Sequence, residues 1–343
     1  MQAVYKARAI ARAFLLLYIL CNRVKIIKTK RRILGMKKSN DQKRHMVGMA
    51  AAAIIGVCMA AGGFLIRMNS TTTVSEVCRP GLFSWKRSAM QEEREEEVQR
   101  AMTGLGCEII YQEIPDSVSD ETVTAFLKRR KQQGQAVFAL AGEAEWAMEE
   151  DASSMKKVLE RISQRNSVSG DARIEGIVWD VEPYLLEEWD TDRPGLMETY
   201  VENLSTAYRQ AKEEDLLVIV CIPHFYDSEK TYAYLDRLVK NGCDAVAVMN
   251  YSKRNEIRQL AGEAELAKKY GRGLINITEL QEPGSHSLTA EQTYYEDGTG
   301  AVRESQDRIR KAYPETELGF AWHCLEPALE LLDREEPGMG EPK

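Results

Sequence analysis

Residues 175–182 read Glu-Gly-Ile-Val-Trp-Asp-Val-Glu, and the interpretation of the fold begins from this stretch. It is a short apolar run that ends in two carboxylates, a pattern typical of a parallel strand covered on both faces. Side chains two apart share a face of a strand, so Val178, Asp180 and Glu182 point the same way. The opposite face carries only apolar residues, which are Ile177, Trp179 and Val181. We therefore expect the two carboxylates to face the interior of a closed sheet.

Seven more runs of this kind occur between residue 79 and the C-terminus. The eight predicted strands are Gly81–Trp85, Glu108–Gln112, Ala136–Leu140, Gly176–Glu182, Leu217–Pro223, Ala245–Tyr251, Leu274–Thr278 and Leu318–His323. Helical patterns separate them, such as Met155, Val158, Leu159 and Ile162 at i, i+3, i+4 and i+7. Eight strand–helix units in this length predict a (β/α)8 TIM barrel. The competing open, doubly wound sheet would carry a glycine-rich phosphate turn after its first strand, and Trp85-Lys86 stands there instead.

The barrel fold places function at the carboxyl ends of the strands. Aromatic, acidic and polar residues gather at these predicted ends, and the candidates for substrate contact are Trp85, Tyr184, Tyr226, Asp227, Asn250, Glu279, Trp322 and His323. Aromatic faces stack on sugar rings, and paired carboxylates cleave glycosidic bonds. Two carboxyls as close as Asp180 and Glu182 resist ionising together, so one pKa should rise toward the value that a general acid needs.

The same segment resembles the fourth-strand signature of glycoside hydrolase family 18, the chitinase-like barrels, which reads D-G-x-D-x-D-x-E. The resemblance implies that Glu182 is the general acid and that Asp180 orients the substrate N-acetyl group. Met249-Asn250-Tyr251 resembles the sixth-strand M-x-Y, which assigns Tyr251 to the same group, and Trp322 resembles the last-strand tryptophan under the sugar. This chain departs from the signature at Val178, where the family has the aspartate that partners Asp180.

A second resemblance keeps another mechanism open. Val181-Glu182-Pro183 resembles the fourth-strand N-E-P of the large clan of retaining glycosidases, whose nucleophile ends strand seven, where this chain has Glu279. Under this reading Glu182 is the acid/base. Family 25 lysozyme-like barrels also carry D-x-E on a middle strand, but their first-strand aspartate has no counterpart here.

The N-terminal part has a different character from the barrel region. Met46–Ile66 is 21 residues without a charge, long enough to cross a bilayer, and it follows a strongly basic segment. Residues 1–45 carry 13 Lys or Arg and one acid, a balance of +12, which leaves −19 for the rest of a chain whose net charge is −7. The positive-inside bias predicts a cytoplasmic N-terminus and an extracellular barrel, or a secreted barrel if the segment is a cleaved signal.

These patterns divide the chain into a basic head (1–45), a membrane anchor or signal (46–67), a linker (68–78) and a barrel (79–343). We expect residues 1–35 to be a mis-called start or a dispensable extension, because Met36-Lys37-Lys38 is typical of the beginning of a signal segment. The five cysteines beyond the membrane segment lack the spacing of a disulfide framework and should be buried small side chains.

The sequence thus predicts an exported or membrane-anchored glycoside hydrolase acting on an N-acetylhexosamine-containing glycan, such as a chitin-like or cell-wall polymer. We expect no cofactor, no metal site and no nucleic-acid partner, since the acidic barrel lacks a basic face and no H-x-x-H or H-E-x-x-H spacing occurs. The rival is a non-catalytic barrel that binds glycan. A closed barrel mouth, or an arginine paired with Glu182, would favour that rival.

Overall fold

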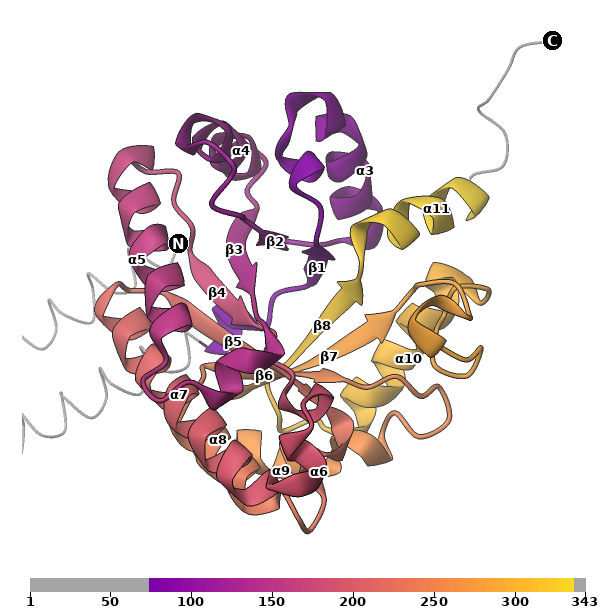
Figure 1. Cartoon of the computed structure of the whole chain (residues 1–343). Helices are drawn as coiled ribbons and strands as arrows, with labels where there is room; N and C mark the ends of the chain where they lie inside the picture. The colour runs from indigo at the N-terminus through magenta and orange to yellow at the C-terminus, as the bar shows by residue number, and fades with distance from the viewer. Residues whose placement is uncertain (1–73, 336–343) are drawn as a thin grey trace, which may run out of the picture. The chain divides into compact units, whose positions relative to one another are not determined.

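A computed structural model describes residues 74–335, and Figure 1 shows its eight strands arranged around one axis with helices outside them. The strands form a closed parallel barrel in the order β1 to β8. Their bounds are β1 Gly81–Ser84, β2 Ile109–Glu113, β3 Ala136–Ala141, β4 Gly176–Trp179, β5 Leu217–Pro223, β6 Ala245–Met249, β7 Gly273–Glu279 and β8 Leu318–His323. All eight predicted strands are confirmed, and so is the predicted (β/α)8 barrel.

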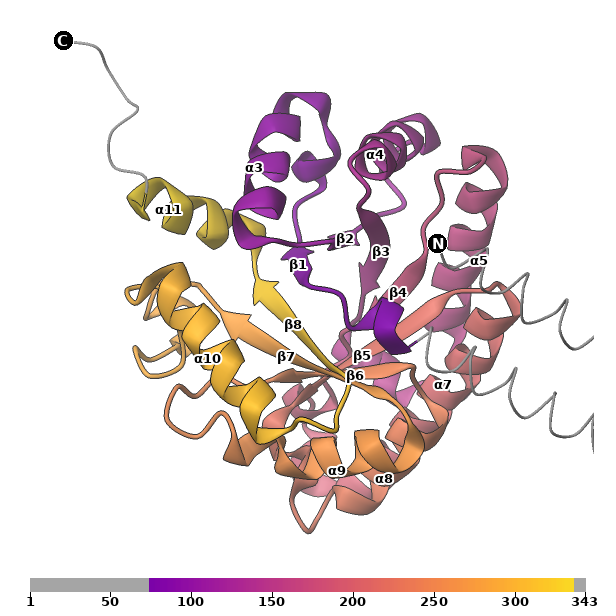
Figure 2. The same ribbon diagram turned by 180° about the vertical axis from the view of Figure 1, so that it is seen from behind.

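The outer ring of helices is seen from both sides in Figures 1 and 2. The helices are α3 Glu95–Leu105, α4 Asp120–Gln132, α5 Ser153–Ser169, α6 Glu188–Thr191, α7 Arg193–Glu213, α8 Tyr232–Asn241, α9 Ala261–Tyr270, α10 Gly298–Ala312 and α11 Leu325–Glu335. Local signals set several of their ends. Ser119 accepts a hydrogen bond from the Thr122 amide at the start of α4, and Gly271 adopts the left-handed conformation that closes α9.

Two apolar layers hold the barrel together. The outer layer lies between strands and helices and includes Ile177, Trp179 and Val181, whereas Val178 packs inside the barrel. The predicted facing of the fourth strand is therefore confirmed. Inside, Gly176 has no room for a side chain, because a Cβ there would lie 2.6 Å from the Phe138 ring.

The amino-terminal ends of the strands are covered by the first described residues. Val74, Val77 and Cys78 are buried with the interior cluster, so residues 74–78 pack as part of the barrel rather than as a linker. Cys78, Cys107, Cys221, Cys243 and Cys324 are all buried free thiols, as predicted.

The predicted membrane segment, residues 46–67, lies outside the described residues, as does the basic head. From residue 74 to residue 335, no helix combines the length and the apolar character needed to cross a bilayer.

Candidate active site

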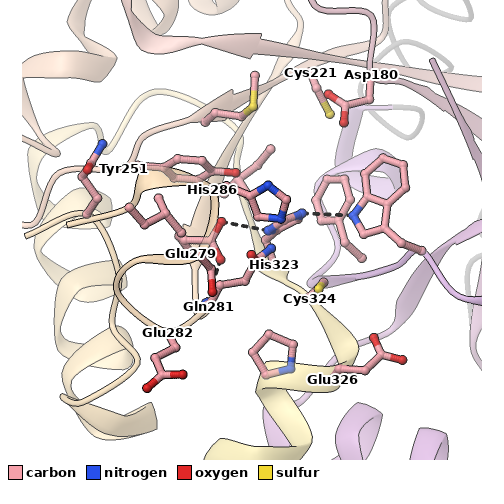
Figure 3. A pocket seen from close by; sticks show the side chains of 18 of the residues that line it. Asp180, Cys221, Tyr251, Glu279, Gln281, Glu282, His286, His323, Cys324 and Glu326 are labelled. Atoms are coloured by element: carbon pink, nitrogen blue, oxygen red, sulfur yellow. Dashed lines mark hydrogen bonds and ion pairs between the residues drawn. The ribbon is translucent and has the colours of Figure 1, made fainter. Parts of the chain in front are cut away.

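A cavity of about 1040 Å³ opens at the carboxyl ends of the strands. Seven of the predicted site residues line it, namely Trp85, Asp180, Glu182, Tyr184, Tyr251, Glu279 and His323. Figure 3 shows part of this group, with Asp180 beside Cys221 on one side and Glu279 beside His323 near the middle. The volume lies at the upper end of the roughly 300–1,000 Å³ that is usual for small-molecule sites.

Asp180 follows directly after β4 and enters the barrel mouth because of two close backbone contacts. Its amide donates to the Ala141 carbonyl at 2.9 Å. Gly142 lies so close that a Cβ there would meet the Asp180 carbonyl oxygen at 2.0 Å. Any larger residue at position 142 would push the Asp180 backbone away, so this glycine is part of the site's construction.

The Asp180 carboxyl has few donors around it. Burial raises its pKa to about 7, and repulsion from Glu182 adds to the effect. Its Oδ1 atom is buried and has no hydrogen-bond partner. The predicted rise of one pKa in the pair therefore falls on Asp180.

Cys221 lies beside Asp180, where Val178 offers no polar group. It belongs to the neighbouring strand β5, and Figure 3 shows its buried thiol next to the Asp180 carboxyl. Burial raises the pKa of this thiol well above its usual value, so it stays protonated. Sequence reasoning missed this residue. The β4–β5 register identifies it, because continuing that register beyond Trp179 and Val220 places Cys221 opposite Asp180, and the register is known only from the folded barrel.

Glu182 lies nearer the opening of the cavity. Its Oε1 accepts a hydrogen bond from the Tyr184 phenol at 2.6 Å. Burial and the Glu182 carboxyl together raise the pKa of Tyr184, which keeps the phenol a donor. No ion pair to Glu182 is present among residues 74–335, and the barrel mouth is open. Neither of the two observations that would have favoured a non-catalytic barrel is therefore seen in the described residues.

Glu279 ends β7 and is surrounded by donors. Its Oε1 accepts from the Leu280 and Gln281 amides, each at 2.8 Å. Its Oε2 lies 2.9 Å from His323 Nδ1. A buried carboxylate held by this many donors has its negative charge well compensated and its orientation fixed.

The contact with Trp85 determines which ring nitrogen of His323 carries the proton. The Trp85 indole nitrogen, which can only donate, lies 3.0 Å from His323 Nε2, so Nε2 must accept. The proton of the neutral ring is therefore on Nδ1, where it is donated to Glu279. The three residues form one directed chain, Trp85 to His323 to Glu279, and Figure 3 draws the contact between His323 and Glu279 as a dashed line.

Tyr251 follows β6 and lines the same cavity as Asp180, Glu182 and Glu279. Its pKa is raised well above the usual value, first by burial and then by Glu279, Asp180 and Glu182. Its phenol therefore stays protonated and can donate into the cavity. In Figure 3 its ring extends from the β6 side toward the centre of the cavity.

Trp322 is a correction to the sequence analysis. It was expected to form a platform under the substrate, but only 1% of it is exposed and it packs in the outer layer beneath the helices. It pairs with Leu82, which also faces outward, so strand alternation turns the next residue, His323, into the cavity. Position 322 thus carries the tryptophan that the resemblance suggested, but its side chain points toward the helices and not into the cavity.

Three further predicted contacts do not line the cavity. Tyr226 is fully buried and stacks on Trp189 at 5.8 Å between ring centres. The Asp227 side chain packs instead beside Gly262 at the start of α9. The Asn250 amide donates to the Glu256 carbonyl and to Asn276 Oδ1, so it holds the loop after β6 rather than a substrate.

The segment after β7 forms one rim of the cavity. Its contributions are Gln281, Glu282, Ser285, His286, Leu288 and Gln292. Tyr294 anchors the segment, because its phenol donates to buried Glu256, which also accepts from Ser305 and Arg308. The opposite rim carries Leu185 beside Tyr184, and Leu185 is 65% exposed.

In the described part of the chain, no group of three His, Cys, Asp or Glu side chains is placed to hold a metal ion.

Neither a family model nor a curated protein sequence matches the chain. Among solved structures, it is similar to a glycoside hydrolase family 18 chitinase from Pseudoalteromonas aurantia, with TM-score 0.48 and 10% identity over 75% of this chain and 99% of that one. It is also similar to group II chitinase catalytic domain 2 of Ostrinia furnacalis, with TM-score 0.46 and 11% identity over 77% and 98%. The glycoside hydrolase domain of PelA from Pseudomonas aeruginosa has TM-score 0.43 and 14% identity over 74% and 96%. Similarity at this level concerns the barrel, so the functional argument depends on the side chains of the cavity.

Proposed function

We propose that the barrel is a glycoside hydrolase that cleaves an N-acetylhexosamine-containing glycan with Glu182 as general acid. One observation carries the proposal: Asp180, Glu182 and Tyr251, placed by two separate strands, line a single open cavity large enough for more than one sugar ring. The size of the cavity and its mixture of aromatic and carboxylic side chains suit an oligosaccharide.

The Asp180–Glu182 pair can supply the proton that the leaving glycosidic oxygen needs. The two carboxyls repel, and the buried member has a pKa of about 7, so the pair binds one proton more readily than two separate carboxyls would. Asp180 stores the proton in the interior, and Glu182 presents it at the cavity surface to the leaving glycosidic oxygen. The Tyr184 phenol fixes the Glu182 carboxyl in place for that transfer.

Tyr251 and Asp180 together suit an N-acetyl group. A neutral phenol donates to the acetamido carbonyl oxygen, while a carboxylate accepts the acetamido N–H. Held in this way, the carbonyl oxygen can attack the sugar's anomeric carbon as the leaving group departs, so that the substrate acts as its own nucleophile. The buried Cys221 thiol lies beside Asp180, where Val178 offers no polar group.

A second version of the same chemistry is favoured by the donors around Glu279. A fixed, charge-compensated carboxylate on β7, across from Glu182 on the β4 side, suits a nucleophile or a group that stabilises a cationic transition state. In that version Glu279 attacks the anomeric carbon and Glu182 serves as acid and then as base.

We further propose that the barrel acts outside the cytoplasmic membrane, exported or anchored through residues 46–66. The uncharged 21-residue run and the +12 head support this. Protease treatment of intact cells that express the full chain would test it. Protection of the barrel from the protease would contradict it.

The central experiment measures release of reducing sugars from N-acetylated chito-oligosaccharides and from peptidoglycan by the full chain, by Glu182→Gln and by Glu187→Gln. Loss of the general acid should lower turnover by about 10²-fold or more. Glu187 is exposed and lies outside the cavity, so Glu187→Gln should behave as wild type. Glycan binding by the wild type without any hydrolysis would support the non-catalytic barrel instead.

A further inference from the structure

The exposed apolar side chains of the barrel gather at its cavity end. Among the described residues, the large apolar side chains that are well exposed are those of Met148, Val168, Leu185, Phe225 and Ile257. All but Val168 lie in the segments that follow β3, β4, β5 and β6, the strand ends at which the cavity opens. Single exposed apolar side chains are ordinary, whereas a group of them beside a cleft marks a binding surface.

Leu185 and Phe225 are the members of this group that adjoin the proposed general acid. Tyr184 and Leu185 both line the cavity, and the Tyr184 phenol donates to Glu182 at 2.6 Å. Phe225 makes a T-shaped contact with the Tyr184 ring, with 5.4 Å between ring centres. Leu185 is 65% exposed and Phe225 is 37% exposed. The two side chains thus continue the cavity wall outward from Glu182, and we call them the apolar rim.

Aromatic packing fixes the position of the apolar rim. Phe225 contacts the half-buried ring of Trp189 at 6.1 Å between ring centres. Trp189 stacks in turn on buried Tyr226, and the Arg193 guanidinium lies 4.2 Å from the Trp189 ring centre. A side chain held in this way loses little freedom when a ligand binds, so its exposed surface can contribute to affinity at low entropic cost.

The size and chemistry of the apolar rim suit a sugar ring. A pyranose presents a face of C–H groups that packs on aromatic and aliphatic side chains while its hydroxyls stay in water. A stable protein interface buries roughly 800 Å² on each partner, which two partly exposed side chains do not supply. The rim after β7 is mostly polar, with Gln281, Glu282 and Ser285 among its lining residues. The occupant that fits best is therefore a further unit of the glycan that the cavity holds.

We propose that the apolar rim is a subsite for a sugar unit that extends out of the cavity past Glu182. The site would then recognise a chain several units long rather than a single glycoside. This inference rests on the proposed function for the neighbouring unit, the N-acetyl sugar held by Asp180 and Tyr251. The subsite itself is a binding property and can be measured without catalysis.

The test compares N-acetylated chito-oligosaccharides of two and six units by calorimetry with the full-length Glu182→Gln chain. The hexamer should bind about tenfold tighter than the dimer, because it fills the cavity and also covers the apolar rim. Adding Leu185→Ser/Phe225→Ser to this chain should weaken hexamer binding about tenfold and leave dimer binding unchanged.

Two control variants in the same chain separate ring contact from general damage. Phe225→Tyr keeps an aromatic ring at the apolar rim and should retain the preference for the hexamer. Val168→Ser removes an apolar side chain that is 63% exposed, close to the 65% of Leu185, but lies on α5 outside the cavity. It should retain the preference as well.

The outcomes distinguish this subsite from the proposed hydrolase. An equal loss for both sugars in the double variant would mean that the apolar rim only supports Tyr184 and Glu182, and this overturns the subsite. A preference that survives in the double variant, or no preference in the parent chain, overturns it too, even if the wild type hydrolyses glycans. A preference that depends on Leu185 and Phe225, in a protein whose wild type hydrolyses neither sugar, supports the subsite and refutes the hydrolase.

Discussion

The carboxylates of β4 and the carboxylate of β7 are the same kind of group in opposite surroundings. Asp180 has one buried oxygen without a donor and a raised pKa, whereas Glu279 receives two amides and an imidazole N–H. A carboxyl deprived of donors holds its proton more tightly, whereas the donors around Glu279 fix the orientation of its carboxyl. The comparison shows that the surroundings of a carboxyl, more than its residue type, decide whether it suits the role of a proton donor or that of a fixed anion in this cavity.

The sharpest way to break this comparison is to change the leaving group. For a natural glycan, both Glu182→Gln and Glu279→Gln should lower kcat/KM by about 10²-fold or more. For a nitrophenyl glycoside, whose leaving group needs no proton, the Glu182→Gln loss should shrink to within about tenfold while the Glu279→Gln loss persists. Steady-state rates on the two substrates check this, and equal losses on both would remove the division of roles.

A second effect concerns pH. If the pair supplies the proton, kcat/KM should fall as pH rises through about 7, where Asp180 loses its proton. In Asp180→Asn the neighbouring carboxyl is gone, so the repulsion that favours protonation is removed and this alkaline fall should move to lower pH, with activity reduced about tenfold or more. A pH–rate profile of the two proteins measures the shift. An unchanged alkaline limb would show that the pair does not titrate in the reaction.

The sequence predicts which face of the fourth strand carries the carboxylates, but it does not predict the contacts that neighbouring strands make with them. The alternation within residues 175–182 placed Asp180 and Glu182 inside the barrel, because apolar neighbours leave one choice of face. On β8 the sequence does not show which face points inward. Phe320 and Trp322 lie on one face and His323 on the other, and all three residue types occur inside barrels. Contacts between strands, such as Cys221 to Asp180 and Trp85 to His323, depend on register and were therefore out of reach.

A third prediction concerns Glu263, a carboxyl without hydrogen-bond donors that does not line the cavity, and its effect on the stability of the fold. It is fully buried in α9, both of its oxygens lack partners, and burial raises its pKa from 4.5 to about 8. Since the folded state binds this proton more tightly than the unfolded chain, its contribution is full below about pH 4.5 and is lost as pH rises toward 8. Glu263→Gln should therefore raise the free energy of unfolding by on the order of 2 kcal/mol at alkaline pH and change it little in acid. Urea unfolding at both pH values measures this, with exposed Glu265→Gln as the control. A gain of equal size in acid would mean that packing, not ionisation, is responsible.

The smallest expected effect comes from the donor at the far end of the β7 chain. Trp85→Phe keeps an aromatic ring against Phe83 but removes the indole N–H that His323 Nε2 accepts. His323 should then lose its single tautomer, and Glu279 should lose part of its fixed orientation, lowering kcat/KM by a few-fold while KM changes little. Nitrogen NMR of the imidazole in the wild type should show the proton on Nδ1 alone, and in the variant a mixture. Trp146→Phe, which removes an indole outside the cavity, should leave both the tautomer and the rate unchanged. A wild-type ring with its proton on Nε2 would contradict the directed chain, and the β7 carboxylate would then lack the third donor that separates it from Asp180.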